Sequence, residues 1–233
     1  RNIARGPALS TPEGRTDPAA AGEGARLQTI AQTGVETAGV SKKEYYLAGG
    51  RLVRAKGIDI VIDAFLQNGK LLKIFGRGFA GFEEELRSKI QNRKSKIEFV
   101  GEISDQEKLE VMANAKAYIF ASFDEDFGIT PVEAMAVGTA VIAFRSGGVR
   151  ETVVDPSTSS PRSDSPRLNS GQAGQAGQVA TGVFFDENTP DALNLAIEKF
   201  ETIRISSDAC RKQAKKFSPE VFDKKIAELV ESF

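Results

Sequence analysis

The sequence predicts a doubly wound α/β domain, in which a parallel sheet carries helices on both of its faces. The first observation is a regular alternation, from residue 45 onward, of short apolar segments with longer amphipathic ones. Short apolar runs are typical of strands buried on both faces, and their alternation with helical segments indicates βαβ units. The second observation is size, because 233 residues of which 40% are hydrophobic suffice for the core of one ordinary domain.

The elements are expected in a strand, helix, strand order. The segments expected to be strands are residues 45–48, 71–75, 97–100, 117–121, 140–144 and 183–185. Helices are expected between them at residues 58–66, 82–90 and 149–153, with one opening at Ser104, where Glu107 completes a capping box, and one from Pro131. Three more helices are expected at the C-terminal end, with Pro190 and Pro219 at first helical positions.

Two stretches depart from this pattern. Residues 1–43 are rich in Ala, Gly, Thr and Pro, and we interpret them as an irregular leader or the remnant of an N-terminal domain. Residues 156–179 contain STSSPRSDSP and GQAGQAGQ, a composition typical of a flexible loop. The domain is therefore expected to cover residues 44–233, with an insert at 156–179.

Charge and composition exclude several classes of function. Lysine and arginine total 31 against 32 acidic residues, so the chain lacks the positive surface of a nucleic-acid-binding protein. It has no histidine and one cysteine, Cys210, which excludes histidine-dependent triads, most zinc sites and disulfides. No apolar run reaches the roughly 18 residues of a transmembrane helix. The lone thiol is compatible with a cytoplasmic protein.

In a doubly wound sheet the ligand binds where strands end and helices begin. The loop after the first expected strand, from Gly49 to Gly57, offers Gly50 for close backbone approach and the cations Arg51 and Lys56. This composition suits a diphosphate. The alternative is that both cations are solvated loop charges.

A second loop, residues 122–135, contains Glu125 and Glu133 with seven residues between them. Thr130 is expected as an N-cap and Pro131 as the first helical residue, so backbone N–H groups near residues 129–132 would face an anion. The alternatives are that Glu133 only completes a capping box with Thr130 and that Glu125 is a solvated acid. Both interpretations stay open.

Two neighbouring features are weaker. Asp124 and Asp126 have the Asp-x-Asp spacing that holds a divalent metal in other sugar-transfer folds, but the further oxygen ligands of a hard metal are not assignable, so no metal site is expected. The strand-to-helix turn at residues 145–151 either approaches the ligand or only reverses the chain.

A dinucleotide site is a rival hypothesis. Gly76, Gly78 and Gly81 match the G-x-G-x-x-G fingerprint, and Glu102 follows about 20 residues later. The match lies in the second βα unit rather than the first, and no later feature indicates a nicotinamide or flavin site. A structural interpretation is also open, in which the glycines make a tight turn.

Taken together, GGRLVRAKGID, EDFGITPVEAMAVG, TAVIAF and SGGVRETV resemble the C-terminal domain of the group 1 glycosyltransferases, also called glycosyltransferase family 4. The resemblance runs from about Tyr45 to Phe233, without the insert. It implies a Rossmann-like domain that is one half of a two-domain GT-B fold. Several motifs occur in the expected order, so the combination is specific.

The resemblance also implies roles for site residues. Arg51 and Lys56 would hold the diphosphate of a nucleotide-sugar donor, Glu125 would contact the transferred sugar, and Glu133 would hold the ribose hydroxyls. The further donor-binding positions that it implies are Gly50, Gly76, Val100, Glu102, Phe127, Gly128, Ile129 and Thr130.

The reaction that this family membership implies is retaining transfer of a sugar from a nucleoside diphosphate to an acceptor hydroxyl, with no cofactor and no obligatory metal. The segment ITPVEAMAVGTAVIAF is similar to that of mannosyltransferases, which suggests a mannose donor and a role in polysaccharide biosynthesis.

The family's N-terminal acceptor domain is not recognisable here, and the acceptor stays unknown. The chain is then a fragment, a subunit that works with a separate acceptor-domain chain, or a non-catalytic nucleotide-binding module; a dinucleotide oxidoreductase domain is the fourth alternative.

Overall fold

In the computed structural model the described residues are 42–91, 93–155 and 179–231. They contain a six-stranded sheet in the order β3-β2-β1-β4-β5-β6, and every neighbouring pair is parallel. The strands are β1 (Tyr45–Gly49), β2 (Leu71–Phe75), β3 (Ile97–Gly101), β4 (Ala117–Phe120), β5 (Val141–Phe144) and β6 (Gly182–Phe185). The predicted doubly wound α/β fold is confirmed.

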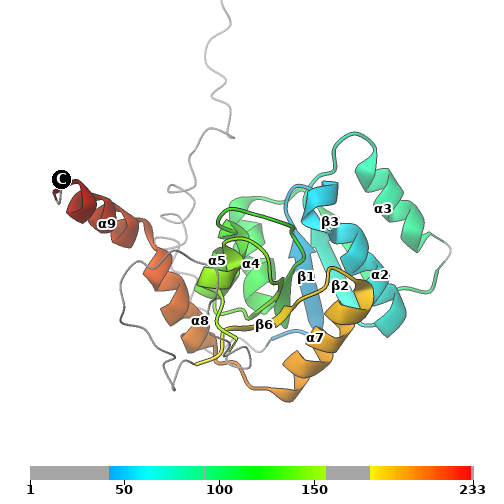
Figure 1. The fold of residues 1–233 in the computed structure, drawn as a ribbon. Coiled ribbons are helices and arrows are strands. Elements are labelled where there is room, and N and C mark those ends of the chain that lie inside the picture. The colour runs from blue at the N-terminus through cyan, green and yellow to red at the C-terminus, as the bar shows by residue number, and fades with distance from the viewer. Residues whose placement is uncertain (1–41, 92, 156–178, 232–233) are drawn as a thin grey trace, which may run out of the picture.

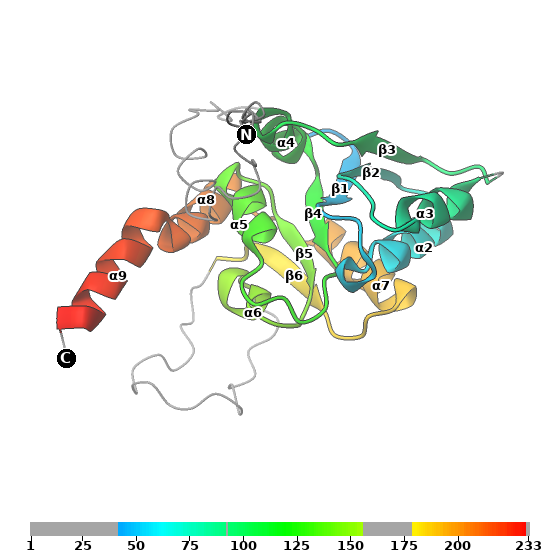
Figure 2. The same cartoon turned by 90° about the horizontal axis from the view of Figure 1, so that it is seen from above.

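Helices cover both faces of the sheet (Figures 1 and 2). One face carries α2 (Ile58–Asn68), α3 (Phe82–Ile90) and α7 (Pro190–Thr202). The other carries α4 (Asp105–Asn114), α5 (Ile129–Ala136) and α8 (Ser207–Ala214). Shorter elements are the 3₁₀ turns η2 (Arg54–Lys56) and η4 (Lys215–Phe217) and the helix α6 (Val149–Thr152).

The core lies between these layers and explains why the apolar segments form strands. Strands β4, β5 and β6 are buried along their whole lengths, as expected for strands covered on both faces. Helix α2 turns Ile58, Val61, Ile62, Ala64 and Phe65 toward the sheet. This spacing of apolar residues is that of an amphipathic helix.

Local sequence signals predicted the starts of three helices, α4, α7 and α9 (Pro219–Glu231). The Ser104 side chain accepts a hydrogen bond from the Glu107 amide, and the Glu107 carboxylate accepts from the Ser104 amide at 2.8 Å, which is the expected capping box. Pro190 is the first residue of α7, and Pro219 is the first residue of α9.

The predicted start of α5 is wrong. The helix begins at Ile129 after Gly128, which has a left-handed conformation with φ of 72° and makes no side-chain cap. Thr130 is therefore not the N-cap, and Pro131 is the third helical residue rather than the first. Pro131 is tolerated there because the first four amides of a helix have no intrahelical acceptor.

The predicted leader, residues 1–43, and the predicted insert, residues 156–179, lie almost wholly outside the described residues. The chain on either side of the insert is joined by hydrogen bonds. The Thr181 amide donates to the Val154 carbonyl at 2.9 Å, and the Val154 amide donates to the Thr181 hydroxyl at 2.9 Å. Val154 and Thr181, on the two sides of the insert, are therefore neighbours just before β6.

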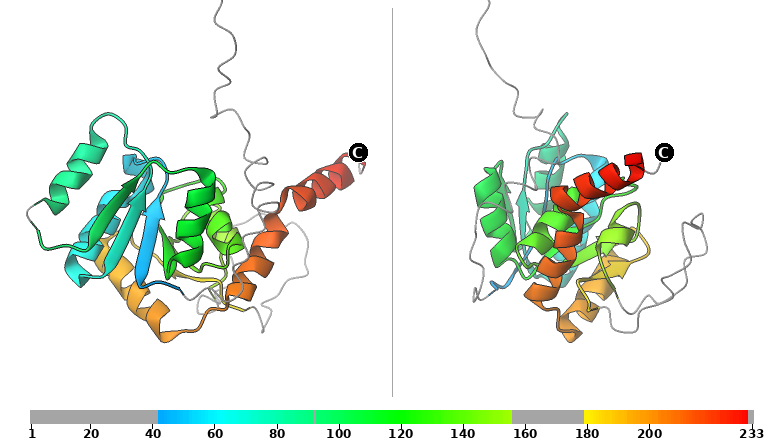
Figure 3. Two further views of the ribbon diagram at one scale, coloured as in Figure 1. Left: turned by 180° about the vertical axis from the view of Figure 1, so that it is seen from behind. Right: turned by 90° about the vertical axis from the view of Figure 1, so that its left-hand side faces the viewer.

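Helix α9 extends away from the rest of the described domain (Figures 1 and 3). Its exposed apolar side chains are Phe222, Ile226, Leu229 and Val230. No helix among the described residues is both long enough and apolar enough to cross a membrane.

Candidate functional site

The strand order reverses between β1 and β4, which pair in parallel through Tyr46 with Ala117 and Leu47 with Tyr118. The loops after these two strands are therefore neighbours at the carboxyl edge of the sheet. Such a switch point is where doubly wound sheets bind ligands. Both loops that the sequence indicated as site-forming meet here.

Lys56 and Glu125 form an ion pair across the switch point, although they are 69 positions apart. The Ser122 hydroxyl donates a hydrogen bond to the same carboxylate oxygen at 2.8 Å. The side chains of Lys56 and Glu125 are only 22% and 28% exposed. They are therefore not the independently solvated loop charges of the alternative interpretation.

Arg51 lies in the same loop as Lys56 but is exposed. Within the described residues its side chain forms no hydrogen bond and no ion pair. The neighbouring Arg54 is engaged elsewhere, since its guanidinium pairs with Glu85 at 2.6 Å and lies 4.9 Å from the centre of the Phe82 ring. Both arginines of the loop are exposed, and Arg51 is the one without a described side-chain partner.

Backbone contacts hold the Glu125 loop in place. The Phe123 amide donates to the Ala55 carbonyl at 3.0 Å, and the Gly148 amide donates to the Glu125 carbonyl at 2.9 Å. A Cβ atom at Gly147 would lie 2.2 Å from the same Glu125 oxygen. The turn at residues 145–151 therefore supports the site loop by close packing, a role that sequence reasoning did not assign.

Glu133 is the fifth residue of α5 and takes no part in a capping box, so the capping interpretation is wrong. Its side chain is 3% exposed and accepts a hydrogen bond from Lys108 Nζ on α4 at 2.9 Å. Lys108 also pairs with Asp105 at 3.2 Å. Sequence reasoning missed Lys108, whose partner lies 25 positions away on another helix.

Tyr118 lies beneath the site and connects its parts. Its hydroxyl donates to the Gly49 carbonyl at 2.9 Å and is hydrogen-bonded to the Thr130 side chain. Burial raises the pKa of the Tyr118 phenol, and the nearby charge of Glu133 raises it further. The phenol therefore stays neutral and fixes the end of β1 relative to the first turn of α5.

Phe127 and Gly128 directly precede α5, and Ile129 and Thr130 are its first two residues. The Phe127 ring packs edge-on against Phe217 at 6.0 Å between centroids, on the side of η4. Gly128 is buried, whereas Ile129 and Thr130 are partly exposed at the first turn of the helix. The amides of Ile129 and Thr130 have no intrahelical acceptor at these positions.

The other predicted donor-binding residues lie in the loops after β1, β2 and β3. The Gly50 amide donates to the Phe75 carbonyl at 3.1 Å, and the Gly76 amide donates to the Gly101 carbonyl at 2.8 Å. A Cβ atom at Gly76 would lie 1.8 Å from the Gly50 oxygen, so these loops pack backbone against backbone. Val100, partly buried, and Glu102, exposed, lie beside them at the end of β3.

The dinucleotide fingerprint serves a structural purpose here. The Gly78 amide donates to the Glu83 carboxylate at 2.9 Å, which lowers the pKa of Glu83 together with a contact from Arg87. Glu84 and Glu85 also lie in the first turn of α3. The Glu83 carboxylate thus takes up an amide of the glycine loop, and the acidic first turn of α3 would repel the pyrophosphate of the dinucleotide hypothesis. Gly81 has φ of 77°, which the tight turn requires.

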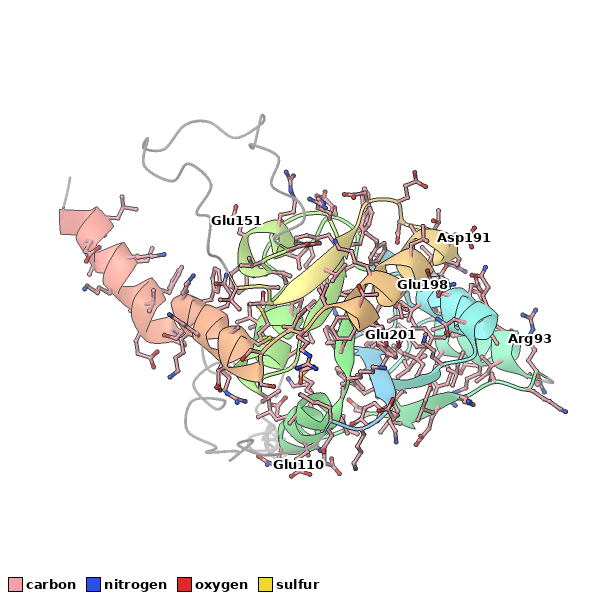
Figure 4. The ribbon with its side chains drawn as sticks, turned by 90° about the horizontal axis from the view of Figure 1, so that it is seen from below. Arg93, Glu110, Glu151, Asp191, Glu198 and Glu201 are labelled. Carbon is pink, nitrogen blue, oxygen red and sulfur yellow. The ribbon has the colours of Figure 1, made fainter. Side chains whose placement is uncertain are left out.

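A cavity of about 560 Å³ lies at the opposite, amino edge of the sheet. It is lined in part by Lys42 and Lys116, which precede β1 and β4, and by Glu201. Figure 4 labels Glu201, which lies on α7. Glu201 accepts hydrogen bonds from Tyr46, Lys70 and Lys116 at 2.8–3.0 Å. Burial would raise the pKa of Glu201, but these donors lower it to about 2. This cluster ties α7 to the sheet and is separate from the switch point.

Acidic residues and the cysteine do not gather into a metal site in the described ranges, where no group of three or more such side chains could hold a metal ion.

Comparisons with known proteins identify the family of this chain. The family model described as "Glycosyl transferases group 1" matches residues 35–160. Glycogen synthase 2 of Nitrosococcus oceani is 32% identical over 157 residues, which is 64% of this chain and 28% of that protein. The α-1,3/1,6-mannosyltransferase ALG2 of Dictyostelium discoideum is 30% identical over 138 residues, which is 50% of this chain and 33% of that protein.

Solved structures share the fold. Sucrose-phosphate synthase from Thermosynechococcus elongatus superposes with a TM-score of 0.64 at 22% identity, covering 88% of this chain and 48% of that one. Anabaena HepE, solved in complex with UDP and glucose, superposes with a TM-score of 0.60 at 22% identity, covering 90% of this chain and 52% of that one. This chain spans about a third of the length of the curated relatives and half of these structures.

The fold and the switch-point loops define a doubly wound α/β domain with one half of the GT-B architecture. Because the family model matches more than half of its residues, the chain belongs to the group 1 glycosyltransferases.

Proposed function

We propose that this chain is the donor-binding half of a retaining glycosyltransferase, which transfers a hexose from a nucleoside diphosphate to an acceptor hydroxyl. The observation that carries the proposal is the Lys56–Glu125 pair, which places a cation and a carboxylate together at the switch point. The Lys56 ammonium can bind a diphosphate, and the Glu125 carboxylate can accept hydrogen bonds from the hydroxyls of a sugar. Family membership supports the same reading.

The diphosphate would be held by Arg51, Lys56 and the start of α5. Arg51 is exposed and has no described partner, so binding an anion breaks no contact that this part of the chain makes. The amides of Ile129 and Thr130 lie at the positive end of the helix dipole. These groups would stabilise the charge that develops on the leaving diphosphate, and we propose that no resident metal is needed.

Glu125 would accept hydrogen bonds from the transferred sugar, and Glu133 would accept them from the ribose diol. The loops with Gly50, Gly76, Val100 and Glu102 would flank the base. The arrangement supports these roles because the loops after β1, β2 and β3 meet at one edge, next to the start of α5. No residue of the described ranges is assigned as a covalent nucleophile.

The donor is proposed to be a mannose nucleotide, on the likeness of residues 129–144 to mannosyltransferases. The similarity to ALG2 supports mannose, and the similarity to glycogen synthase 2 makes a glucose nucleotide the competitor. The acceptor would bind to another domain or a separate chain. The free, buried Cys210 is compatible with the cytoplasm, which is the compartment we propose.

The test is incubation of the chain with GDP-mannose, UDP-glucose or ADP-glucose, with NMR detection of the released sugar. We expect slow hydrolysis of one donor, with the α anomer appearing first because retaining chemistry keeps the configuration of the α-linked donor. Glu125→Gln should slow the release, whereas Glu201→Gln, at the opposite edge of the sheet, should not. First appearance of the β anomer would refute retention, and binding without release would indicate a non-catalytic nucleotide-binding module.

A further inference from the structure

An ion pair between α4 and α5 connects the helix that follows β3 with the Glu133 carboxylate. Lys108 Nζ lies 2.9 Å from Glu133 Oε1 and 3.2 Å from Asp105 Oδ1. The exposed fractions of the Lys108 and Glu133 side chains are 14% and 3%, whereas that of Asp105 is 66%. The ammonium thus lies between a solvated carboxylate and a buried one.

A carboxylate as deeply buried as Glu133 is stable in its charged form only when an opposite charge or several donors accompany it. Lys108 supplies that charge to Oε1, and its own position is fixed from the solvent side by Asp105. Glu133 also makes contacts beyond this pair, and the Glu133 charge acts on Tyr118. The orientation of the Glu133 carboxylate is therefore set within a packed polar group.

Helix α4 starts directly after the loop that carries Glu102. The reciprocal capping box of Ser104 and Glu107 fixes the first turn of this helix, one residue before Lys108. Lys108 consequently links the end of β3 to Glu133 on α5. A displacement of either element changes the length of the 2.9 Å contact.

We propose that Lys108 is a positioning residue for ribose recognition. It holds the Glu133 carboxylate in place and directed toward the nucleoside, so that the ribose diol is preferred over a sugar without these hydroxyls, while Lys108 itself touches no ligand. This inference rests on the proposed role of Glu133 at the donor ribose.

The test compares the affinity of each variant for a ribonucleoside diphosphate with its affinity for the 2′,3′-dideoxy form, by calorimetry. The wild-type chain should bind the ribose form about tenfold more tightly or better, because hydrogen bonds from the ribose diol to a charged carboxylate contribute that much binding free energy. Lys108→Met should reduce this preference to under about threefold with little change in dideoxy affinity, and Lys108→Arg should retain most of it. Lys89→Met, which removes an ion pair with Asp63 on α2, is the matched control.

The possible results distinguish the positioning role of Lys108 from the ribose-binding role of Glu133. A full ribose preference in Lys108→Met would overturn the positioning role while leaving Glu133 at the ribose. A wild-type chain without any ribose preference would overturn both. Should Lys108→Met fail to fold, Lys108→Gln provides the same comparison. In a Glu133→Gln background the substitution of Lys108 should change the preference no further, and an undiminished effect there would contradict action through Glu133.

Discussion

Replacing Lys56 with methionine removes the cation at the centre of the proposed diphosphate site and keeps most of the side-chain volume. Both partners of the Lys56–Glu125 pair are partly exposed, at 22% and 28%, so the cost in folding free energy should be only about 1 kcal/mol. A hydrogen bond from a charged group to the diphosphate is worth about 1.5–3 kcal/mol. We therefore expect a loss of roughly 10- to 150-fold in affinity for the nucleoside diphosphate.

The assay is calorimetric titration with a nucleoside diphosphate and with the corresponding nucleoside, which lacks the phosphates. The loss should be confined to the diphosphate, since Lys56 is not expected to contact base or ribose. Lys89→Met removes a comparable ion pair, with a lysine that is 30% exposed, on the outer surface of α2 and α3. Equal diphosphate affinities for wild type and Lys56→Met, with both chains folded, would refute the assignment of this loop.

Three further predictions concern the supports of the site and the fold. Gly147→Ala should lower the unfolding free energy by about 1–3 kcal/mol and weaken nucleotide binding, because the added Cβ meets the Glu125 carbonyl. Gly69→Ala, at a similar φ of 69° but in open space, should leave nucleotide binding unchanged. Equal losses of binding in the two variants would refute the packing argument. Glu201→Gln should destabilise the fold at pH 7 in chemical denaturation. The pKa of Glu201 is lowered to about 2 from an ordinary 4.5, so its contribution is present above pH 4.5 and is lost as the pH falls toward 2, and a difference from wild type that persists at pH 2 would contradict this assignment. Burial raises the pKa of Cys210 to about 12, so a thiol reagent should label it only on unfolding; rapid labelling of the native chain would show that the thiol is accessible.

The sequence predicted those features that depend on local patterns or on topology. Apolar runs in the sequence predict buried strands, and the Ser104–Glu107 capping box lies within four residues. The meeting of Lys56 and Glu125 could also be expected, because the loops that carry them follow strands and such loops share one edge of a parallel sheet. Their direct ion pair was not predicted.

The remaining features depend on contacts between segments that no local pattern records. The Thr130-Pro131 pair is a strong local signal for a helix start, yet Gly128 takes the left-handed conformation and α5 begins two residues before Pro131. The role of Lys108 follows only from the packing of α4 against α5. The support of Glu125 by Gly147 likewise requires that two loops meet within van der Waals distance.

In our proposal the switch point binds a nucleoside diphosphate without a metal. The most direct measurement is titration of the chain with UDP, GDP, ADP and NAD, each in the presence and absence of magnesium. We predict saturable binding of at least one nucleoside diphosphate, with the same affinity in both conditions and weaker or no binding of NAD. Preference for NAD, strict dependence on magnesium, or no binding of any nucleotide by the folded chain would contradict the account.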